Sequence, residues 1–495
     1  MDLKTVTDIN DLLEAVRPLE KRGTAPVAPI STLTDDSRAV EAGALFVAVR
    51  GVASDGHKFI PSALEKGAAV IVAEEFPEPL PQGNVLWVRV ADSRDALGHL
   101  ASRWYGDPSE ELTLVGVTGT NGKTTIATLL YELARALGHK AGLISTVANI
   151  VDGDSEAAEH TTPHPLKLNN LLRRMVDAGC TFAAMEVSSH AADQHRIAGL
   201  DFDGAVFTNL TRDHLDYHHT VEAYLRAKKS FFDGLKERAF AIVNADDRNG
   251  AVMLQNCAAR RKQYYSVRSA ADVSVRLIED RLDGMLLSFD GTEMEVPFVG
   301  SFNASNLAAV YGAALLLGWP REDVLRAMSG LIPVAGRFQP FRSADGVTAI
   351  VDFAHTPDAL VNVLDTIAET APAGADIWCV CGAGGDRDRG KRPLMAQVAD
   401  ARCSHLVLTA DNPRSEDPRA IIDEMLAGLE PERRQAAIAE PDRRKAIALA
   451  VAAAKPGDVV LVAGKGHETE QVIGSVAEHF DDREEVRRAL SDRMH

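Results

Sequence analysis

An apolar run, a glycine-rich turn and an apolar helix follow one another in the clearest pattern of this 495-residue chain. The apolar run extends from Leu112 to Val117 and has the length of a buried strand. After the turn, apolar residues recur three and four positions apart, which is the spacing of one helix face. They are Ile126, Leu129, Leu130, Leu133 and Leu137. Together with the next apolar run, AGLIST, this pattern predicts a right-handed strand–helix–strand unit of a parallel sheet.

Four further apolar runs, separated by helix-like stretches, occupy the last third of the chain, and each ends in a polar loop. They are VTAIVDFAHTP, DIWCVCGAGGDRDRGKRP, HLVLTADNPRSEDP and VVLVAGKGHE. The alternation predicts a second parallel sheet whose loops leave from the carboxyl edge, where such sheets bind ligands. We expect an anionic group to dock there, because the loops carry cations in an otherwise acidic protein. The cations are Arg387, Arg389, Lys391, Arg392, Arg414 and Lys465.

Two other segments complete the predicted organisation. Near the N-terminus, apolar runs at 44–49 and 68–73 enclose a helix-like stretch and predict a small α/β unit. From Asp272 to Glu295 apolar and polar residues alternate, which favours a pair of strands rather than part of the parallel sheet. We therefore predict an α/β protein of three domains: a small N-terminal α/β domain (1–90), a central phosphate-loop domain with a parallel sheet (91–337), and a C-terminal Rossmann-like domain (338–495).

Composition narrows the class of protein. With 46% hydrophobic and 25% charged residues, the chain is typical of a soluble globular protein. A formal net charge of −18 argues against a nucleic-acid partner, which would favour basic patches. The sequence shows no signal peptide and no apolar run long enough to span a membrane, so we expect a cytoplasmic protein without a membrane partner. The five cysteines are scattered, and we interpret them as reduced packing residues; Cys379 and Cys381 should share one face of a strand.

The turn TGTNGKTT indicates nucleotide chemistry. A loop that enters a helix N-terminus presents unpaired backbone N–H groups and the positive end of the helix dipole, which suit a phosphate. Lys123 can reach terminal phosphates, and the hydroxyl of Thr124 or Thr125 can hold a magnesium ion. The strict phosphate-loop pattern is not matched, because Val117 stands where its first glycine belongs. A glycine turn without a ligand is the alternative, but the flanking strand and helix favour a nucleotide.

Acidic and histidine residues follow the next two predicted strands. Glu186 lies within the apolar run FAAMEV, where a carboxylate needs a partner. A structural salt bridge is one interpretation, and a magnesium ion on the nearby phosphates is the one we favour. A further cluster contains Asp213, His214, Asp216, His218 and His219. Zinc is the first candidate for this cluster, but a nucleotide site favours oxygen ligands and magnesium, and some of these histidines are expected to be ordinary loop residues.

Several of these strings occur in an order that resembles the Mur ligase family, the cytoplasmic enzymes that build the peptide stem of peptidoglycan. They are TGTNGKTT, MEVSSH, QHR, TNLTRDHLDYH and YLRAKKSFF. The resemblance implies that Glu186 and His214 bind magnesium together with Thr124, and that Lys228 is carbamylated by carbon dioxide to give a further metal ligand. It also implies ATP binding by the loop and by residues further along the chain. These residues are Gly119, Thr120, Asn121, Gly122, Lys123, Thr124, Thr125, Asn303, Arg337, Asp352 and His355.

The first segment, with DSRAVEAGALFVAVRG and DGHKFI, resembles the N-terminal domain of the members that bind UDP-sugar peptides. The resemblance implies a UDP-N-acetylmuramoyl-L-alanyl-D-glutamate substrate, held by residues of the first and central domains. These residues are Asp35, Ser37, Val52, Ala53, Ser54, His160, Thr161, Thr162, Ser188, Gln194 and Arg196. In the third segment, DNPR is similar to the members that add meso-diaminopimelate. The residues that the resemblance assigns to this amino acid are Arg387, Asp411, Asn412, Pro413, Arg414, Gly464 and Glu468.

The implied activity is an ATP-dependent ligation through an acyl phosphate, in which Lys123, Glu186, His214 and Lys228 are catalytic, by a protein that we expect to be a monomer. Three departures affect details of the expected sites: DFAHTP and GRFQ stand where the family usually has DYAHTP and GRME, and His160 replaces an asparagine. Two rival classes are a nucleotide-binding regulatory protein, which would need only the first motif, and a folylpoly-γ-glutamate synthetase, which should lack the first domain and DNPR.

Overall fold

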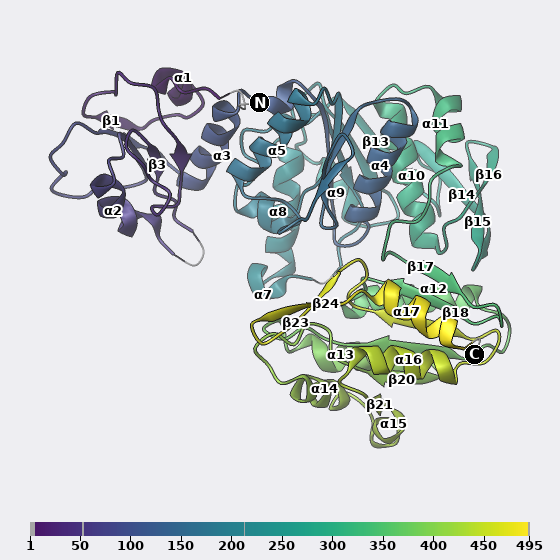
Figure 1. Ribbon diagram of the computed structural model, residues 1–495. Coiled ribbons are helices and arrows are strands. Elements are labelled where there is room, and N and C mark those ends of the chain that lie inside the picture. The colour runs from purple at the N-terminus through teal and green to yellow at the C-terminus, as the bar shows by residue number, and fades with distance from the viewer. Residues whose placement is uncertain (1–4, 52–53, 212, 494–495) are drawn as a thin grey trace.

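Three sheets with helices packed against them organise the chain in the computed structural model, which describes residues 5–51, 54–211 and 213–493. Figure 1 shows the N-terminal unit beside the central unit, and the third unit beneath the central one. The fold is the three-domain α/β arrangement that the sequence predicts. The divisions at residues 90 and 337 remain predictions. Among the described residues, no helix is both long and apolar enough to cross a bilayer.

The first sheet has the order β1-β5-β4-β3-β2, with β1 antiparallel to β5 and the other neighbours parallel. Its strands are β1 (Glu20–Arg22), β2 (Leu33–Thr34), β3 (Leu45–Val47), β4 (Val70–Ala73) and β5 (Leu86–Arg89), and its helices are α1 (Ile9–Glu14), α2 (Ile60–Glu65) and α3 (Ser93–Trp104). Leu97 and Leu100 of α3 pack in the same apolar cluster as Val70 and Val88, so the packing of this sheet continues past residue 90.

The central sheet has eleven strands in the order β16-β15-β14-β13-β12-β11-β6-β10-β7-β8-β9. The strands are β6 (Thr113–Thr118), β7 (Ala141–Ile144), β8 (Asn149–Val151), β9 (Asp154–Glu156), β10 (Phe182–Glu186), β11 (Gly204–Phe207), β12 (Phe240–Asn244), β13 (Arg261–Ser266), β14 (Val273–Arg281), β15 (Gly284–Phe289) and β16 (Thr292–Val296). Strand β6 lies between β10 and β11, and all three are parallel. The loop after β6 therefore opens at the point where the strand order reverses, which is where doubly wound sheets bind ligands.

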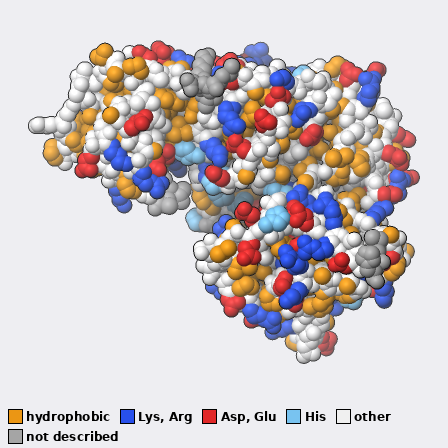
Figure 2. Space-filling view, in the orientation of Figure 1, with side chains coloured by type: hydrophobic (Ala, Val, Ile, Leu, Met, Phe, Trp, Pro, Cys, Tyr) orange, Lys and Arg blue, Asp and Glu red, His pale blue; other side chains and the backbone are white. Residues whose placement is uncertain are grey.

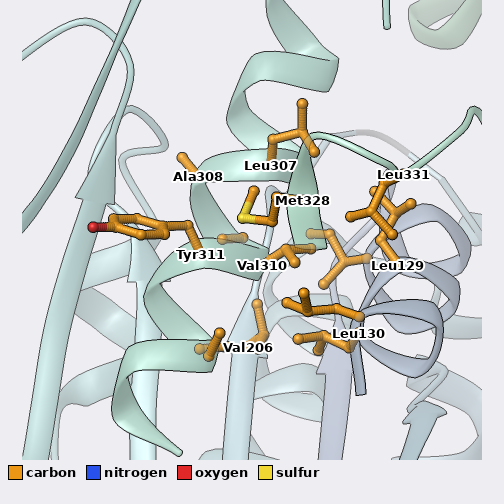
Figure 3. Packing of buried hydrophobic residues seen from close by; sticks show 14 of the residues in the cluster. Leu129, Leu130, Val206, Leu307, Ala308, Val310, Tyr311, Met328 and Leu331 are labelled. Carbon is orange, nitrogen blue, oxygen red and sulfur yellow. The ribbon is translucent and has the colours of Figure 1, made fainter. Parts of the chain in front are cut away.

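Helices cover both faces of this central sheet. They are α4 (Lys123–Ala136), α5 (Pro165–Asp177), α6 (Ser189–Asp193), α7 (Leu215–His218), α8 (Val221–Asp233), α9 (Gly250–Leu254), α10 (Ser301–Leu316) and α11 (Arg321–Met328). Successive strand residues alternate between the two apolar cores: Ala183 packs in one core and Ala184 in the other. Figure 3 shows one core, where Leu129 and Leu130 of α4 lie close to Val310 of α10. Burial on both faces explains why these strands appear as continuous apolar runs in the sequence.

The segment from Asp272 to Glu295 differs in part from the prediction. Its strands are antiparallel to one another, as the alternation indicates, but there are three of them and not two. They are also not separate from the parallel sheet, because β14 pairs with the end of β13 through Tyr265 and Ser266. Alternation reports that one face of a strand is solvated, but it does not report which strand lies next to it.

The third sheet has the order β17-β18-β22-β19-β20-β21 and is parallel except for β17. Its strands are β17 (Gln339–Arg342), β18 (Thr348–Asp352), β19 (Ile377–Cys381), β20 (His405–Leu408), β21 (Ile438–Ala439) and β22 (Val459–Ala463). Its helices are α12 (Pro357–Thr370), α13 (Lys391–Asp400), α14 (Pro418–Leu426), α15 (Pro431–Ala436), α16 (Arg443–Ala453) and α17 (Asp482–Asp492), and a separate hairpin joins β23 (Glu470–Ile473) to β24 (Val476–His479). The four predicted loops therefore do leave from one edge. All five cysteines are free and buried, and Cys379 and Cys381 pack in the same core.

Candidate active site

The loop between β6 and α4 is built so that only glycine fits at two of its positions. Gly119 has φ 149° and Gly122 has φ 90°. A Cβ atom at Gly119 would lie 1.8 Å from the Thr208 hydroxyl oxygen, and one at Gly122 would lie 2.5 Å from the Asn306 side-chain oxygen. The loop is thus packed directly against two neighbouring side chains. The backbone N–H groups of Thr120 and Asn121 donate to Asn209, at 2.8 Å to its carbonyl oxygen and at 3.0 Å to its side-chain oxygen, so the N-terminus of α4 is the part of the loop that suits an anion.

Lys123 is folded back over this loop. Its Nζ donates to the carbonyl oxygens of Gly119 at 2.9 Å and Thr120 at 2.8 Å. Burial lowers the pKa of Lys123, while the carboxylates of Glu186 and Asp213 oppose that change. The ammonium group is therefore held by carbonyl groups within the same cavity as these two carboxylates.

Glu186, at the end of β10, is the buried carboxylate that the sequence indicates; it is 1% exposed. One oxygen, Oε1, accepts a hydrogen bond from the backbone N–H of Thr146 at 2.7 Å. The other oxygen, Oε2, is buried without a hydrogen-bond partner in the part of the chain that the structure describes. A buried carboxylate oxygen without a partner is costly, and a bound cation would satisfy it. This observation fits a magnesium ion better than the structural salt bridge considered for Glu186.

Lys228 lies on α8 and is 1% exposed. Its Nζ donates to the Gly119 carbonyl oxygen at 2.6 Å and lies 4.5 Å from the centre of the Tyr224 ring. Burial, together with the nearby Lys123 cation, lowers the pKa of Lys228 well below its ordinary value. A lysine in these surroundings is inclined to the neutral amine, which is the form that reacts with carbon dioxide.

His214 precedes α7, and its ring packs edge-on against the His190 ring at 4.8 Å. Burial lowers the pKa of His214 to about 4, against the opposing charge of Asp213, so the ring is neutral near pH 7. Within the ranges 5–51, 54–211 and 213–493, no group of three His, Cys, Asp or Glu side chains is arranged to hold a metal ion. His218 instead contacts the Ser189 hydroxyl at 3.0 Å, and His219 is exposed. The Asp216 side chain lies outside the described residues.

Residues from the segment before β17, here called the linker (334–338), and from the end of β18 lie beside the nucleotide loop. Arg337 donates through Nη2 to the Thr124 hydroxyl at 3.1 Å, and its guanidinium lies 4.3 Å from the centre of the Phe353 ring. Asp352 accepts hydrogen bonds at 2.7 Å from the backbone N–H groups of Phe338 and Ala354, so its carboxylate holds the linker in place. His355 Nδ1 forms a hydrogen bond with the Phe353 carbonyl oxygen at 2.8 Å. The two phenylalanines at which the chain departs from the usual family strings, Phe338 and Phe353, thus pack beside the predicted ATP residues.

The nucleotide loop and the residues described above line one cavity of about 610 Å³. The sequence motifs predict part of this lining. The cavity brings together the loop from Thr120 to Thr125 with Glu186, His214, Lys228 and Arg337. Predicted ATP and dipeptide residues that also line it are Asn303, Asp352, His355, Thr161 and Ser188. Figure 2 shows the surface hollowed where the three units meet, with histidine side chains along the hollow.

The sequence motifs do not indicate the residues at the end of the cavity away from the phosphate loop. Residues after β12 and β13, at the start of α10 and along α12 line this end; they include Asn244, Asp246, Asp247, Arg268, Ser301, Asn362 and Thr366. The positions after β12 and β13 lie at the carboxyl edge of the central sheet, and this placement is the signal that could have found them. A polar region beyond a phosphate loop suits the nucleoside of the bound nucleotide.

Three of the residues predicted for the UDP-dipeptide form a chain of contacts beside Glu186. The Thr162 hydroxyl donates to the Glu186 carbonyl oxygen at 2.8 Å, and Arg196 donates to the Thr162 carbonyl oxygen at 2.9 Å and to the Gln194 side-chain oxygen. His160 is exposed. In the first unit, the Asp35 carboxylate forms a hydrogen bond with His164 Nε2 of the central unit at 3.1 Å.

Ser37 and Ser54 of the first unit, which we predict to bind the UDP-dipeptide, lie away from the nucleotide cavity. The Ser37 carbonyl oxygen accepts a hydrogen bond from Lys66, and the Ser54 carbonyl oxygen accepts one from the Gly51 N–H. Neither Ser37 nor Ser54 is among the described residues that line the nucleotide cavity. Val52 and Ala53 lie outside the described residues.

The residues predicted for diaminopimelate gather at the carboxyl edge of the third sheet. Asn412 donates to Glu468 at 2.8 Å, and Arg414 donates to the Gly385 carbonyl oxygen at 2.8 Å in the loop that carries Arg387. Gly464 has φ 122°, and a Cβ atom there would lie 2.5 Å from the Asp411 carboxylate. Pro413 packs so closely that a Cβ atom at Gly385 would lie 1.8 Å from its carbonyl oxygen. The structure therefore brings these seven residues together, and their binding of diaminopimelate stays a prediction.

Strand β23 supports this cluster from behind. The backbone of Arg414, which has φ 51°, pairs with Val472 and Gly474. Gln471 is buried and donates to the Asp411 carbonyl oxygen at 2.7 Å. His467 connects the cluster to the nucleotide cavity, because it precedes Glu468 in the chain and its ring packs 5.0 Å from the ring of Phe353, which lines the cavity.

The prediction that six cationic side chains at this edge bind an anion is wrong for several of them. Arg392 is fully buried and paired with Glu416 at 2.7 Å and Glu424 at 2.8 Å, and Arg389 is also paired with Glu424. Lys465 is fully buried, and Lys391 donates to the His355 carbonyl oxygen at 3.0 Å. Arg387, which is exposed, and Arg414, which is half-buried, are the arginines of the run that have no ion pair among the described residues. The partner carboxylates come from other segments, so the sequence pattern of the loops does not reveal these pairs.

Comparison with known proteins agrees with this geometry. The model of "Mur ligase family, catalytic domain" matches residues 29–105, that of "Mur ligase middle domain" matches 117–314, and that of "Mur ligase, glutamate ligase domain" matches 336–466. The chain belongs to the Mur ligase family, whose members are ATP-dependent carbon–nitrogen ligases.

Within that family, a relative from Bacteroides thetaiotaomicron is 54% identical over 477 residues, which cover 96% of this chain and 98% of the relative. It carries the name UDP-N-acetylmuramoyl-L-alanyl-D-glutamate–2,6-diaminopimelate ligase. A solved structure of the same name is 35% identical, with a TM-score of 0.69 over 99% of this chain and 100% of its own. A MurF ligase from Thermotoga maritima, solved with ADP, shares the fold at 20% identity and a TM-score of 0.60, over 94% of this chain and 98% of its own.

Proposed function

We infer that this protein uses ATP to join meso-2,6-diaminopimelate to the D-glutamate of UDP-N-acetylmuramoyl-L-alanyl-D-glutamate, a step of peptidoglycan precursor synthesis. The observation that carries this inference is the position of two clusters. The phosphate loop with Glu186 forms one, and Asn412, Arg414 and Glu468 form the other; His467, next to Glu468, contacts Phe353 of the nucleotide cavity. Full-length similarity to a ligase of that name supports the choice of substrates. The same similarity and the first unit argue against both rival classes.

The reaction requires two anions to meet. The side-chain carboxylate of the substrate's D-glutamate attacks the γ-phosphorus of ATP, ADP leaves, and an acyl phosphate forms. The amine of diaminopimelate then attacks the acyl carbon, and phosphate leaves as the amide forms and a proton is released. Lys123 and Arg337, both lining the cavity, neutralise the charge that gathers at the γ-phosphate. Preorganised charges of this kind act without rearrangement at the moment of reaction.

Magnesium fits the residues present in the cavity. Thr124, Glu186 and His214 would hold the ion, together with a carbamate on Lys228, and the ion would supply neutralisation of the phosphate charge. The partnerless Oε2 of Glu186 and the neutral ring of His214 support this assignment. For Lys228, we propose that the neutral Nζ attacks carbon dioxide, an N–C bond forms and a proton leaves, which converts a buried neutral amine into an anion.

We assign the predicted binding residues to the three substrates as follows. The loop from Gly119 to Thr125 and Asn303, Arg337, Asp352 and His355 hold ATP. The dipeptide nucleotide is held by Asp35, Ser37, Val52, Ala53, Ser54, His160, Thr161, Thr162, Ser188, Gln194 and Arg196. Diaminopimelate is held by Arg387, Asp411, Asn412, Pro413, Arg414, Gly464 and Glu468. We also propose that the protein is cytoplasmic, because its substrates are soluble, and that it acts as a monomer.

An amino-acid-dependent assay of phosphate release tests this function. With ATP, magnesium and the UDP-dipeptide present, we expect release on adding diaminopimelate and far slower release with lysine or ornithine. Equal rates without any amino acid would contradict ligation, and faster release with lysine would contradict the assignment of diaminopimelate.

A further inference from the structure

Lys465, in the loop after β22, is a fully buried lysine that is held by the side chains assigned to the amino acid. Its Nζ donates to the Asn412 side-chain oxygen at 3.1 Å and to Glu468 Oε2 at 2.8 Å. It does not face solvent, so it cannot attract an anion from outside. Its two contacts place the Lys465 ammonium on the buried side of Asn412 and Glu468.

The contacts of Asn412 leave only one orientation for its amide. The oxygen Oδ1 accepts hydrogen bonds from Lys465 Nζ and from the backbone N–H of Val472 at 3.0 Å. Both partners can only donate, and the Glu468 carboxylate that receives the Nδ2 hydrogen bond can only accept. Lys465 therefore helps to turn the N–H₂ group of Asn412 away from itself, where its second hydrogen can meet a ligand carboxylate.

The charges at this cluster are balanced only when Lys465 is counted. Around Arg414 lie the cation Arg387 and the carboxylates of Asp386, Asp411 and Glu468. Lys465 supplies the third cation through its ion pair with Glu468. Behind Asp411, Arg443 and Asp482 neutralise each other at 2.7 Å. A balanced cluster matches a ligand end that carries both an ammonium and a carboxylate, whereas the ammonium of lysine alone adds an uncompensated positive charge.

We propose that Lys465 is a positioning residue that sets selectivity for diaminopimelate over lysine. It orients Asn412 as a donor for the distal carboxylate, and it cancels the Glu468 charge that would otherwise favour a lone ammonium. This inference rests on the proposed function.

The test compares Lys465→Met with wild type, measuring kcat and KM for diaminopimelate, for lysine and for 2-aminopimelate, which keeps the distal carboxylate and lacks the distal amine. We expect the ratio of kcat/KM for diaminopimelate to that for lysine to fall by about tenfold or more, because a charge left unmatched beside a ligand is costly. The KM values for ATP and the UDP-dipeptide should stay nearly unchanged. Lys445→Met, an exposed lysine on α16, is the matched control and should leave all ratios as in wild type.

Glu468→Gln sharpens the test, because it removes the opposite charge. Lys465→Met should shift preference toward lysine over 2-aminopimelate, and Glu468→Gln should shift it the other way. The double variant, which leaves neither charge, should lie between the two. If Lys465→Met does not fold, the double variant and Glu468→Gln still decide the matter, because their two preferences must differ in the stated direction.

An unchanged ratio in a folded Lys465→Met protein overturns the proposal, and so does an equal rise in KM for all three substrates, which would indicate a purely structural role. These failures differ from failure of the proposed function. In that case, wild type itself would show no phosphate release that depends on diaminopimelate.

Discussion

Two buried lysines, one in the nucleotide cavity and one in the amino-acid cluster, are equally hidden but have different surroundings. Lys228 contacts a carbonyl oxygen and an aromatic ring, and the structure gives it no ion pair among the described residues. Lys465 has a carboxylate at 2.8 Å. The comparison teaches that burial alone does not define the role of a lysine. Without a counter-ion it is disposed to covalent chemistry as a neutral amine, and with one it serves as a fixed cation.

The largest expected effect in the nucleotide cavity is that of Lys123→Ala. Loss of this cation should lower phosphate release by roughly 10²-fold or more, because it acts on the charge that develops in the transition state. The melting temperature should change little, since among the described residues the Lys123 ammonium donates its hydrogen bonds to carbonyl groups of its own loop. Lys140→Ala, an exposed lysine paired with Asp152, serves as the control. Near-normal turnover of Lys123→Ala would mean that the nucleotide site is misplaced.

Substitution of Lys228 tests directly whether this lysine acts as a carbamate or as a cation. Lys228→Ala should lose activity by about 10²-fold, and Lys228→Glu should recover a small part of it by restoring a carboxylate on a shorter arm. Carbon-13 NMR of protein supplied with labelled bicarbonate should show a carbamate signal in wild type. The signal should vanish in Lys228→Ala and persist in Lys229→Ala, because Lys229 is paired with Asp233. A bare ammonium at Lys228 in an active, magnesium-bound crystal would rule out the carbamate.

In the amino-acid cluster, Arg414→Ala should act on one substrate only. We expect its KM for diaminopimelate to rise by about 10–100-fold, because a charged hydrogen bond to the distal carboxylate is lost. The KM values for ATP and the UDP-dipeptide should change far less. Arg419→Ala, an exposed arginine on α14, controls for loss of charge. An equal loss of affinity for all three substrates would show that Arg414 stabilises the fold instead of binding the amino acid.

The smallest expected effect is on pH dependence at His467, which joins the two regions. Burial lowers the pKa of His467 to about 3, so between that value and about 6.5 the unfolded chain binds a proton that the folded chain does not. Stability should therefore fall as pH falls below about 6.5 and be constant above it, with respect to this group. From about pH 7.5 to about pH 5.5 this contributes up to about 1.4 kcal/mol, or a melting temperature lower by roughly 2–4 °C. His467→Gln should show a smaller decrease; an identical decrease would contradict the assignment.

Periodicity explains which parts of this architecture the sequence predicts. The unit from Leu112 to Ile144 was predicted because a strand period and a helix period follow one another directly. Helix α10 has no such signal, since it is buried around most of its circumference, and only its glycine start marks it. The third sheet was predicted from four repeated strand-and-loop patterns, whereas the attachment of β14 to β13 depends on contacts that no local pattern records.

The candidate site shows the same limit. Its backbone-built part, the loop with Gly119 and Gly122, was found because glycine is required there whatever surrounds it. The buried state of Arg392 and Lys465 depends on partners such as Glu416, which is brought in from a different loop. Charge in a sequence does not reveal which neighbours will neutralise it.

The pairing of the 411–414 loop with β23 has a consequence for evolution. Residues 411–414 and 465–474 hold each other through Asn412, Arg414, Lys465 and Gln471. A gene that acquired a new 411–414 loop by recombination would encode a loop whose supporting strand was selected for the old one. We therefore expect the two segments to be inherited together, as a single module, whenever a ligase of this family changes the amino acid that it adds.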